Sequence, residues 1–140
     1  MKNYEIPTLA ENINKVINHV NETKNKNFNL NYGLTKNSKR LKVAIKEIEA
    51  KIPAELKELE DKVWVVAKEE AEKNNQEVSF DLGLSILTEE ENKTRTELLA
   101  TFNEFLNYEN ELDLYYFDAE KCEDFNLDIE FVDLLTDFIR

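Results

Sequence analysis

Apolar side chains recur at steps of three and four residues through the first half of the chain. The first such series consists of Leu9, Ile13, Val16 and Val20. It follows Pro7-Thr8, a favourable start for a helix, so we predict a helix over residues 8–22. Residues 21–31 are rich in Asn and Lys, which favour turns and solvation. We therefore expect these residues to connect the first helix to a second one in a helical hairpin.

A longer series with the same spacing follows, and a proline interrupts it. Its members are Leu41, Ile45, Ile48, Ile52, Leu56, Leu59, Val63 and Val66. Pro53 lies within the series, and a proline inside a helix costs about 3 kcal/mol, whereas one in the first turn costs little. We predict two helices of about 20 residues each that meet near Ile52. A single continuous helix, kinked at Pro53, is the alternative.

The hydrophobic period changes to two residues in two shorter stretches. In the first, apolar residues alternate with polar residues or glycine at Val78, Phe80, Leu82, Leu84 and Ile86. In the second, polar or aromatic residues separate the apolar or aromatic positions Leu112, Leu114 and Tyr116. Such alternation is typical of a strand with one buried face. We predict that strands at 77–86 and 111–116 pair in a small sheet, which needs helices on one face because two strands alone are marginally stable.

Two further helices are predicted in the second half of the chain. Thr88 precedes Glu91 by three residues, which is the spacing of a capping box, so a helix should begin at Thr88 and end near Tyr108. The closing helix is predicted from the apolar residues Ile129, Val132, Leu135 and Ile139.

Together these patterns predict an α+β fold that is predominantly helical, with elements in the order α-α-α-β-α-β-α. The N-terminal helical hairpin and a third helix after Pro53 would pack with the two-stranded sheet and the C-terminal helices. A chain of 140 residues fits one domain. Within it we distinguish a helical hairpin region at 1–75, basic at its start, from an acidic, aromatic-rich α/β region at 76–140.

Charge is distributed unevenly along the chain. Residues 1–52 carry 10 Lys or Arg and 5 Asp or Glu, whereas residues 53–140 carry 8 and 25, for a net charge of −12. Nine of the fourteen aromatic residues lie between Phe102 and Phe138, within the acidic part. Carboxylates beside bulky apolar side chains favour a binding surface. The acidic balance favours a protein partner with a basic surface over nucleic acid or an anionic membrane.

No residue pattern indicates an enzyme, a metal site or a cofactor. Acidic residues around the single Cys122 disfavour its thiolate, and the single His19 lies at the margin of the predicted hairpin. Only two glycines are present, so there is no phosphate-binding loop, and the carboxylates after Glu120 lack the pattern of a calcium loop. We predict no catalytic, cofactor-binding or metal-ligating residue. No apolar run is long enough to span a bilayer, so we expect a cytoplasmic protein.

The candidate partner-binding residues lie mainly in the acidic part of the chain. They are Asp113, Tyr115, Glu120 and Asp124. The carboxylates of this region would imitate a nucleic-acid backbone if they shared one surface at the spacing of phosphates. Trp64 lies in a run of four apolar residues at 63–66, so more than one helix face is apolar there. That turn is either buried between the hairpin and the sheet or exposed as a binding hot spot.

A basic helix face provides an alternative function. Its members are Lys36, Lys39, Arg40, Lys42 and Lys46. They fall in an arc opposite the apolar positions and would either follow a phosphate backbone or form a solvated face. We interpret the nearby Phe28 and Tyr32 as aromatic residues at the edge of the core rather than as base-stacking groups. A further alternative is self-association as a homodimer, in which the basic hairpin of one subunit meets the acidic tail of another.

The order of elements resembles that of small acidic accessory proteins of tailed bacteriophages. The likeness lies in the Lys-rich hairpin, the run 98–106, the short stretch 111–116 and the closing residues 134–139. It implies a viral setting, and no catalytic residues can be carried over from it. In that setting the acidic, aromatic-rich C-terminal surface leads us to predict an inhibitor or adaptor that acts on a host protein in the host cytoplasm, with a nucleic-acid-binding defence protein as one such target.

Overall fold

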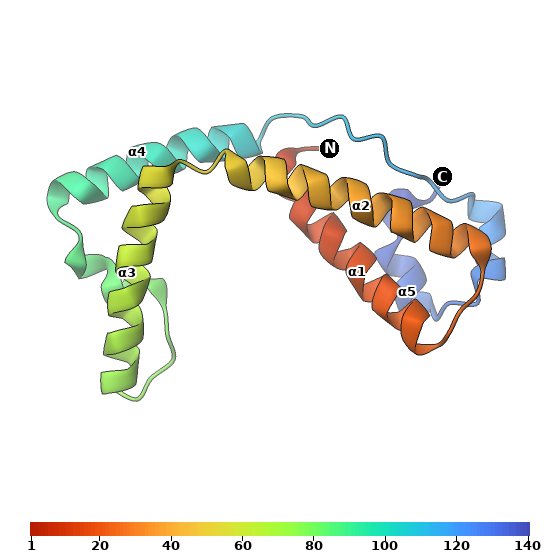
Figure 1. The fold of residues 1–140 in the computed structure, drawn as a ribbon, viewed down its shortest axis with the longest axis horizontal. Helices are drawn as coiled ribbons and strands as arrows, with labels where there is room; N and C mark the ends of the chain where they lie inside the picture. Colours follow the sequence, from red (N-terminus) through yellow and green to blue (C-terminus); the bar gives the residue numbers. More distant parts are fainter. The chain divides into compact units, whose positions relative to one another are not determined.

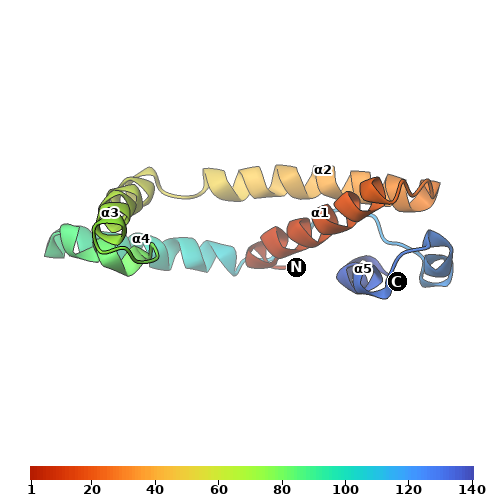
Figure 2. The same ribbon diagram turned by 90° about the horizontal axis from the view of Figure 1, so that it is seen from below.

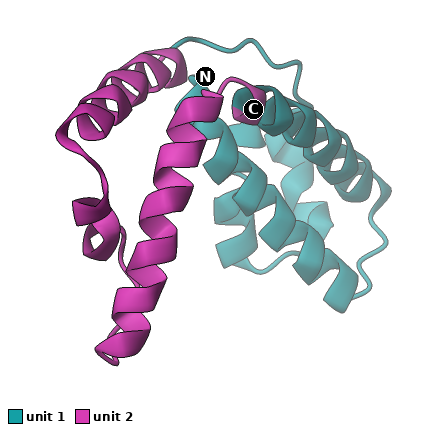
Figure 3. Ribbon diagram, turned by 60° about the vertical axis from the view of Figure 1, so that its left-hand side comes forward, with its two compact units in different colours: residues 1–48, 108–140 teal, residues 49–107 magenta.

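The computed structural model describes all residues from 1 to 140, in five α-helices and four short 3₁₀ segments. The chain divides into two compact units (Figure 3). Unit 1 contains residues 1–48 and 108–140, and unit 2 contains residues 49–107. Unit 2 is therefore inserted, in sequence, between the two segments of unit 1.

The N-terminal helices of unit 1 follow the apolar series closely. Helix α1 spans Ile6–Glu22, with Pro7 in its first turn, and buries Leu9, Ile13, Val16 and Val20. After a connection at 23–27 the chain enters helix α2, which spans Phe28–Ala50 (Figure 1). The predicted hairpin of two helices is thus confirmed, and its connection is shorter than the Asn-rich stretch because α2 begins at Phe28.

Pro53 separates two helices rather than bending one. Helix α2 ends at Ala50, and helix α3 spans Ala54–Lys73. Pro53 immediately precedes α3 with φ −59° and ψ 133°, an extended conformation that a helix interior does not allow. Proline has no N–H to donate, but the residue that precedes a helix needs none for the helical ladder. The predicted meeting of two helices near Ile52 is confirmed.

The predicted two-stranded sheet does not form, and the fold is all-helical rather than α+β in the order α-α-α-β-α-β-α. Residues 80–86 of the first predicted strand form a 3₁₀ segment, η2 (Phe80–Ile86). Its Gly83 is buried against the backbone of α3, and a Cβ there would lie 2.9 Å from the Ala67 nitrogen and closer still to the Val63 carbonyl oxygen. The alternating pattern therefore reflects close packing of a tight turn on a helix.

The second predicted strand is extended but has no strand beside it. Residues 111–116 run along α2, as Figure 1 shows, and isolated bridges flank them, antiparallel between Lys2 and Glu109 and parallel between Phe117 and Ile139. The backbone of Tyr115 bonds instead to the side chain of Asn37. Leu114 and Tyr116 line a hollow with Thr8 and Leu9 of α1, so the period-two alternation arises from an unpaired segment with a different helix on each side, without any ladder.

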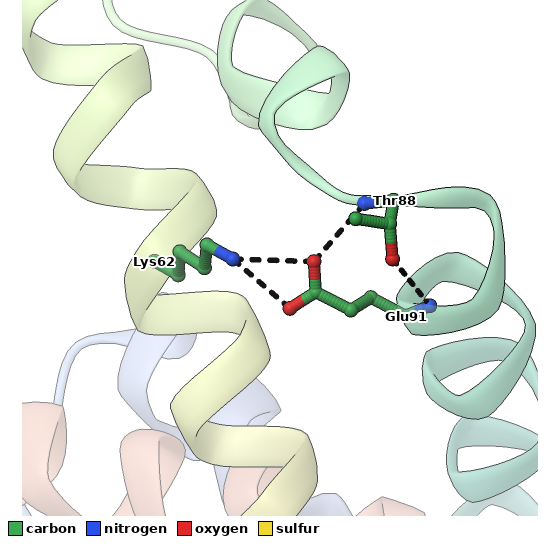
Figure 4. Close-up of polar contacts among 3 residues, drawn as sticks. All are labelled: Lys62, Thr88 and Glu91. Atoms are coloured by element: carbon green, nitrogen blue, oxygen red, sulfur yellow. Dashed lines mark hydrogen bonds and ion pairs between the residues drawn. The ribbon is translucent and has the colours of Figure 1, made fainter.

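In unit 2, helix α4 spans Glu89–Leu106 and begins with the predicted capping box. The Thr88 N–H donates to Oε1 of Glu91 at 3.0 Å, and the Glu91 N–H donates to the Thr88 hydroxyl at 3.1 Å. Lys62 of α3 donates to both oxygens of the same carboxylate, at 3.2 and 3.0 Å (Figure 4). The start of this helix at Thr88 is confirmed, and the carboxylate also ties α3 to α4.

The C-terminal segment is more broken than the single predicted helix. It contains the 3₁₀ segment η3 (Ala119–Phe125), the short helix α5 (Ile129–Leu134) and the 3₁₀ segment η4 (Thr136–Phe138). Helix α5 packs beside α1, as Figures 1 and 2 both show, and the rings of His19 and Phe131 stack at 3.7 Å. None of the helices combines the length and the apolar character that crossing a lipid bilayer requires.

Candidate interaction surfaces

Asparagine side chains hold the C-terminal segment against the hairpin of unit 1. Asn25 donates from Nδ2 to the Phe125 carbonyl at 2.7 Å, and Asn27 donates from Nδ2 to the Asp124 carbonyl at 3.0 Å. The Asn27 side chain also accepts from the Leu30 N–H at 3.0 Å, at the start of α2. The Asn-rich connection thus caps a helix and satisfies backbone carbonyls of the acidic segment, where the sequence indicated only a solvated turn.

Every carboxylate of the acidic segment, residues 109–137, is exposed. The residues are Glu109, Glu111, Asp113, Asp118, Glu120, Glu123, Asp124, Asp128, Glu130, Asp133 and Asp137. Three of them have a basic group within 4 Å: Glu109 lies 3.2 Å from the N-terminal amine, Asp113 lies 2.9 Å from Arg40, and Asp128 lies 3.9 Å from His19. The other eight have no ion pair. A group of unneutralised carboxylates thus faces solvent on unit 1.

The aromatic residues of this segment serve mainly as core. Phe117 and Phe125, together with Phe138 just after the segment, are at most 2% exposed, so they cannot anchor a partner. The exposed apolar side chain is instead Ile129, 87% exposed at the start of α5, between Asp128 and Glu130. The sequence pattern assigned Ile129 to the buried face of the closing helix. Its two acidic neighbours are the signal that could have marked it as a surface residue.

The four predicted contact residues of the acidic segment fall into two kinds. Glu120 and Asp124 are exposed and have no ion pair, as a docking surface requires. Asp113 is exposed but paired with Arg40. Tyr115 is half-buried, with its ring 5.5 Å edge-on from Tyr32, so its main role is packing. The structure thus joins Asp113 and Arg40, which the sequence assigned to two different functions.

Trp64, the fifth predicted contact residue, lies in unit 2. The residue is 38% exposed, and its indole meets the ring of Phe80 edge to face at 5.3 Å. The guanidinium of Arg95 lies 4.6 Å from the centroid of the same Phe80 ring. Val65, the next residue in the run, is 59% exposed. Trp64 is therefore part of a small aromatic contact with one edge open to solvent, and the sheet that would have covered it is absent.

The outward face of α2 carries aromatic and basic side chains together. Phe28 is 75% exposed and lies outside the core, whereas Tyr32 is 47% exposed and keeps an edge contact with Tyr115. The two rings stack with centroids 5.9 Å apart and planes 21° from parallel. The ammonium of Lys36 lies 5.8 Å from the Tyr32 ring centroid. Of the predicted basic residues, Arg40 is paired with Asp113, while Lys36, Lys39 and Lys46 have no ion pair.

Cys122 lies in a site that disfavours its thiolate. Burial raises the pKa of the Cys122 thiol, and the charge of Asp118 adds to the rise. The Cys122 Sγ lies 3.4 Å from the Asp118 carbonyl oxygen, to which the thiol donates. The acidic neighbours in sequence suggested the same direction for the pKa, although burial is the larger cause and Asp118 is the acidic residue that adds to it. No group of three or more His, Cys, Asp or Glu side chains is arranged to hold a metal ion.

Comparison of the chain with known protein families, with curated proteins and with solved structures found no match.

Proposed function

We propose that this protein is a non-enzymatic binding protein whose acidic segment docks on a basic surface of another protein. The observation that carries the proposal is the exposure of all eleven carboxylates between Glu109 and Asp137, eight of them without an ion pair. Such a surface raises the rate of encounter with a basic partner and selects against acidic ones. It also predicts an association that weakens as salt is added.

An apolar contact is needed beside the charges, because exposed ion pairs alone contribute little affinity. Ile129 supplies it, since its side chain is almost fully exposed and is flanked by Asp128 and Glu130. Burying an isoleucine in a partner's pocket contributes roughly 1.5–3 kcal/mol. The proposed docking surface therefore consists of Ile129 as the anchor, with Glu120 and Asp124 among its charges.

The resemblance to accessory proteins of tailed bacteriophages suggests the setting of this interaction. In that setting the partner is a host protein, and the phage-encoded protein acts as a stoichiometric inhibitor or adaptor. A nucleic-acid-binding defence protein has the basic surface that an acidic segment would occupy in place of a phosphate backbone. Asp113, whose charge Arg40 partly neutralises, would contribute less to this contact than Glu120 or Asp124.

The test is an affinity capture from bacterial lysate, treated with nuclease and performed at low and at moderate salt. The wild-type bait is compared with a Glu120→Lys/Asp124→Lys variant and with an Ile129→Ser variant. The matched control is Glu69→Lys/Glu72→Lys, which makes the same change in net charge at exposed positions of α3. We expect one host protein that the wild type and the control retain at low salt, and that the other two variants lose.

Two outcomes would contradict the proposal. The first is equal capture by the wild type and by the Glu120→Lys/Asp124→Lys variant, since the partner would then bind elsewhere. The second is recovery of nothing but the bait, combined with light scattering that shows a larger species at higher protein concentration. That result would favour self-association.

A further inference from the structure

One face of α2 presents aromatic rings and lysines in a continuous row. Its members, which we call the α2 stripe, are Phe28, Tyr32, Lys36, Lys39, Lys42, Val43 and Lys46. Successive members are three or four residues apart or adjacent, so they share one side of the helix. This side is opposite the buried residues Leu34 and Leu41. From Phe28 to Lys46 the stripe extends about 27 Å at the helical rise of 1.5 Å per residue.

The stripe is positively charged although the protein as a whole is acidic. Its four lysines have no carboxylate within ion-pair distance. The shallow hollow around its first half is lined by Phe28, Asn31, Tyr32, Thr35, Lys36 and Lys39, with no acidic residue among them. Carboxylates gather toward its second half, where Glu47, Glu111 and Asp113 line a hollow with Lys39 and Val43 and where Arg40 pairs with Asp113. The first half is therefore the part open to an anion.

The two rings of the stripe are exposed at the surface of the protein. No other segment covers Phe28, whose exposure is 75%. Tyr32 stacks loosely on Phe28, and the ring of Tyr115 contacts Tyr32 edge-on with the ring centroids 5.5 Å apart. An aromatic ring with an accessible face, beside lysines that are free to pair with phosphates, is the arrangement by which proteins hold unpaired bases.

We infer that the α2 stripe binds single-stranded nucleic acid. Bases stack on Phe28 and Tyr32, and the phosphates between them pair with Lys36 and Lys39. A duplex fits less well, because its bases are already stacked and offer no face to these rings. An acidic peptide would satisfy the lysines but would leave the rings without a matching partner. The stripe borders the acidic segment, since Tyr32 contacts Tyr115, but the inference rests on the rings and lysines of α2 and does not depend on the function proposed above.

The test measures fluorescence anisotropy of a labelled oligothymidylate with the full chain at several salt concentrations. Base stacking on one aromatic ring is worth a factor of between about 5 and 150 in affinity, so Phe28→Ala and Tyr32→Ala should each weaken binding by that range. For a single strand, each phosphate contact adds about −0.7 to the slope of log K against log salt concentration. The variant Lys36→Gln/Lys39→Gln removes two contacts and should therefore make that slope shallower by about 1.4. A hairpin duplex of the same labelled length should bind more weakly.

Matched controls separate this site from general attraction to polyanions. Tyr4→Ala removes an aromatic ring that is 52% exposed outside the stripe, and Lys57→Gln removes an exposed lysine from α3; neither should change binding. Circular dichroism verifies that each variant is folded. The inference is overturned by absence of binding at low salt, or by binding that the two ring variants leave unchanged. Equal competition by polyglutamate would overturn it as well, because a non-specific contact or an acidic protein partner would then explain the lysines.

Discussion

The side-chain amide of Asn37 forms both of its hydrogen bonds with the backbone of one residue, Tyr115. Nδ2 donates to the Tyr115 carbonyl at 2.9 Å, and the Tyr115 N–H donates to Oδ1 at 2.7 Å. Asn37 is fully buried in unit 1, on the inner face of α2. The amide thus takes the place of a neighbouring strand and satisfies an extended segment that has no other backbone partner at this point.

Replacing Asn37 should therefore loosen the acidic segment at its attachment to α2. In Asn37→Ala the N–H and carbonyl of Tyr115 lose their partners, and each unsatisfied buried group costs about 1–3 kcal/mol. We expect unit 1 to lose at least about 2 kcal/mol of unfolding free energy in urea, and the Tyr115 amide to lose protection from hydrogen exchange. Asn14→Ala, at an exposed position of α1, is the control. Unchanged protection of the Tyr115 amide would contradict this role.

The carboxylate of Glu91 should make the stability of unit 2 depend on pH. The hydrogen bond from the Thr88 backbone N–H, followed by the contact with Lys62, holds the pKa of Glu91 below its ordinary value. A carboxyl whose pKa is lower in the folded state stabilises that state above its unfolded pKa, about 4.3 for glutamate. The contribution is lost as pH falls through the folded value. Glu91→Gln should therefore be less stable than the wild type at neutral pH and similar to it well below pH 4.

Urea unfolding at neutral pH and at acid pH measures this difference. Trp64 is the only tryptophan of the chain and lies in unit 2, so its emission reports the relevant unit. Glu90→Gln, at the neighbouring exposed position, is the matched control for removal of a carboxylate. A deficit in Glu91→Gln that stays constant from neutral to acid pH would mean that packing, and not the charge, is responsible.

Gly83→Ala should disrupt the contact between η2 and α3. No glycine in the chain has a positive φ, so the requirement is for space rather than for an unusual backbone conformation. The new methyl group would meet the α3 backbone at the Val63 carbonyl, which cannot move aside as a side chain could. We expect a loss of about 1–3 kcal/mol or more, seen as an earlier thermal transition in Trp64 emission. Ser85→Ala, in the same 3₁₀ segment but exposed, should leave the transition unchanged.

Cys122 should react slowly with alkylating reagents. Its pKa is raised first by burial and then by Asp118, so less thiolate is present at mildly alkaline pH than in a free thiol. Iodoacetamide labelling should be slower than that of the urea-unfolded chain. Asp118→Asn should speed it only modestly, because burial is the larger cause. A rate equal to that of the unfolded protein would show that Cys122 is more accessible than its surroundings indicate.

The helices of this fold were predictable because their signals are local. Pro53 ends one helix by its chemistry alone, and Thr88 with Glu91 forms a capping box within four residues. The predicted strand at 77–86 was wrong because an alternating pattern shows which side chains are apolar but not how closely another segment packs against the backbone. Gly83, the one residue in that stretch without a side chain, was the available sign that another backbone approaches closely.

The attachment of the acidic segment could not be predicted in the same way. Asn37 lies between Leu34 and Leu41 on the apolar side of α2, where a hydrophobic residue would be ordinary. A polar residue at such a position indicates that something must bond to it, but not that the partner is Tyr115, 78 residues away. The exposure of Phe28 and of Ile129 could not be predicted for a similar reason. Periodicity predicts which face of a helix is apolar, whereas the contacts of the rest of the chain decide which end of that face remains covered.

The insertion of unit 2 between residues 48 and 108 has a consequence for the order in which the protein matures on the ribosome. At synthesis rates of about 5–20 residues per second, all residues of unit 2 are made several seconds before residues 108–140, which complete the core around α1 and α2. During that interval the amide of Asn37 and the space beside Gly33, which Phe117 later fills, stay open. The nascent hairpin is thus incomplete until the last segment is made, and those seconds are when it is most exposed to chaperones, proteases or a neighbouring chain.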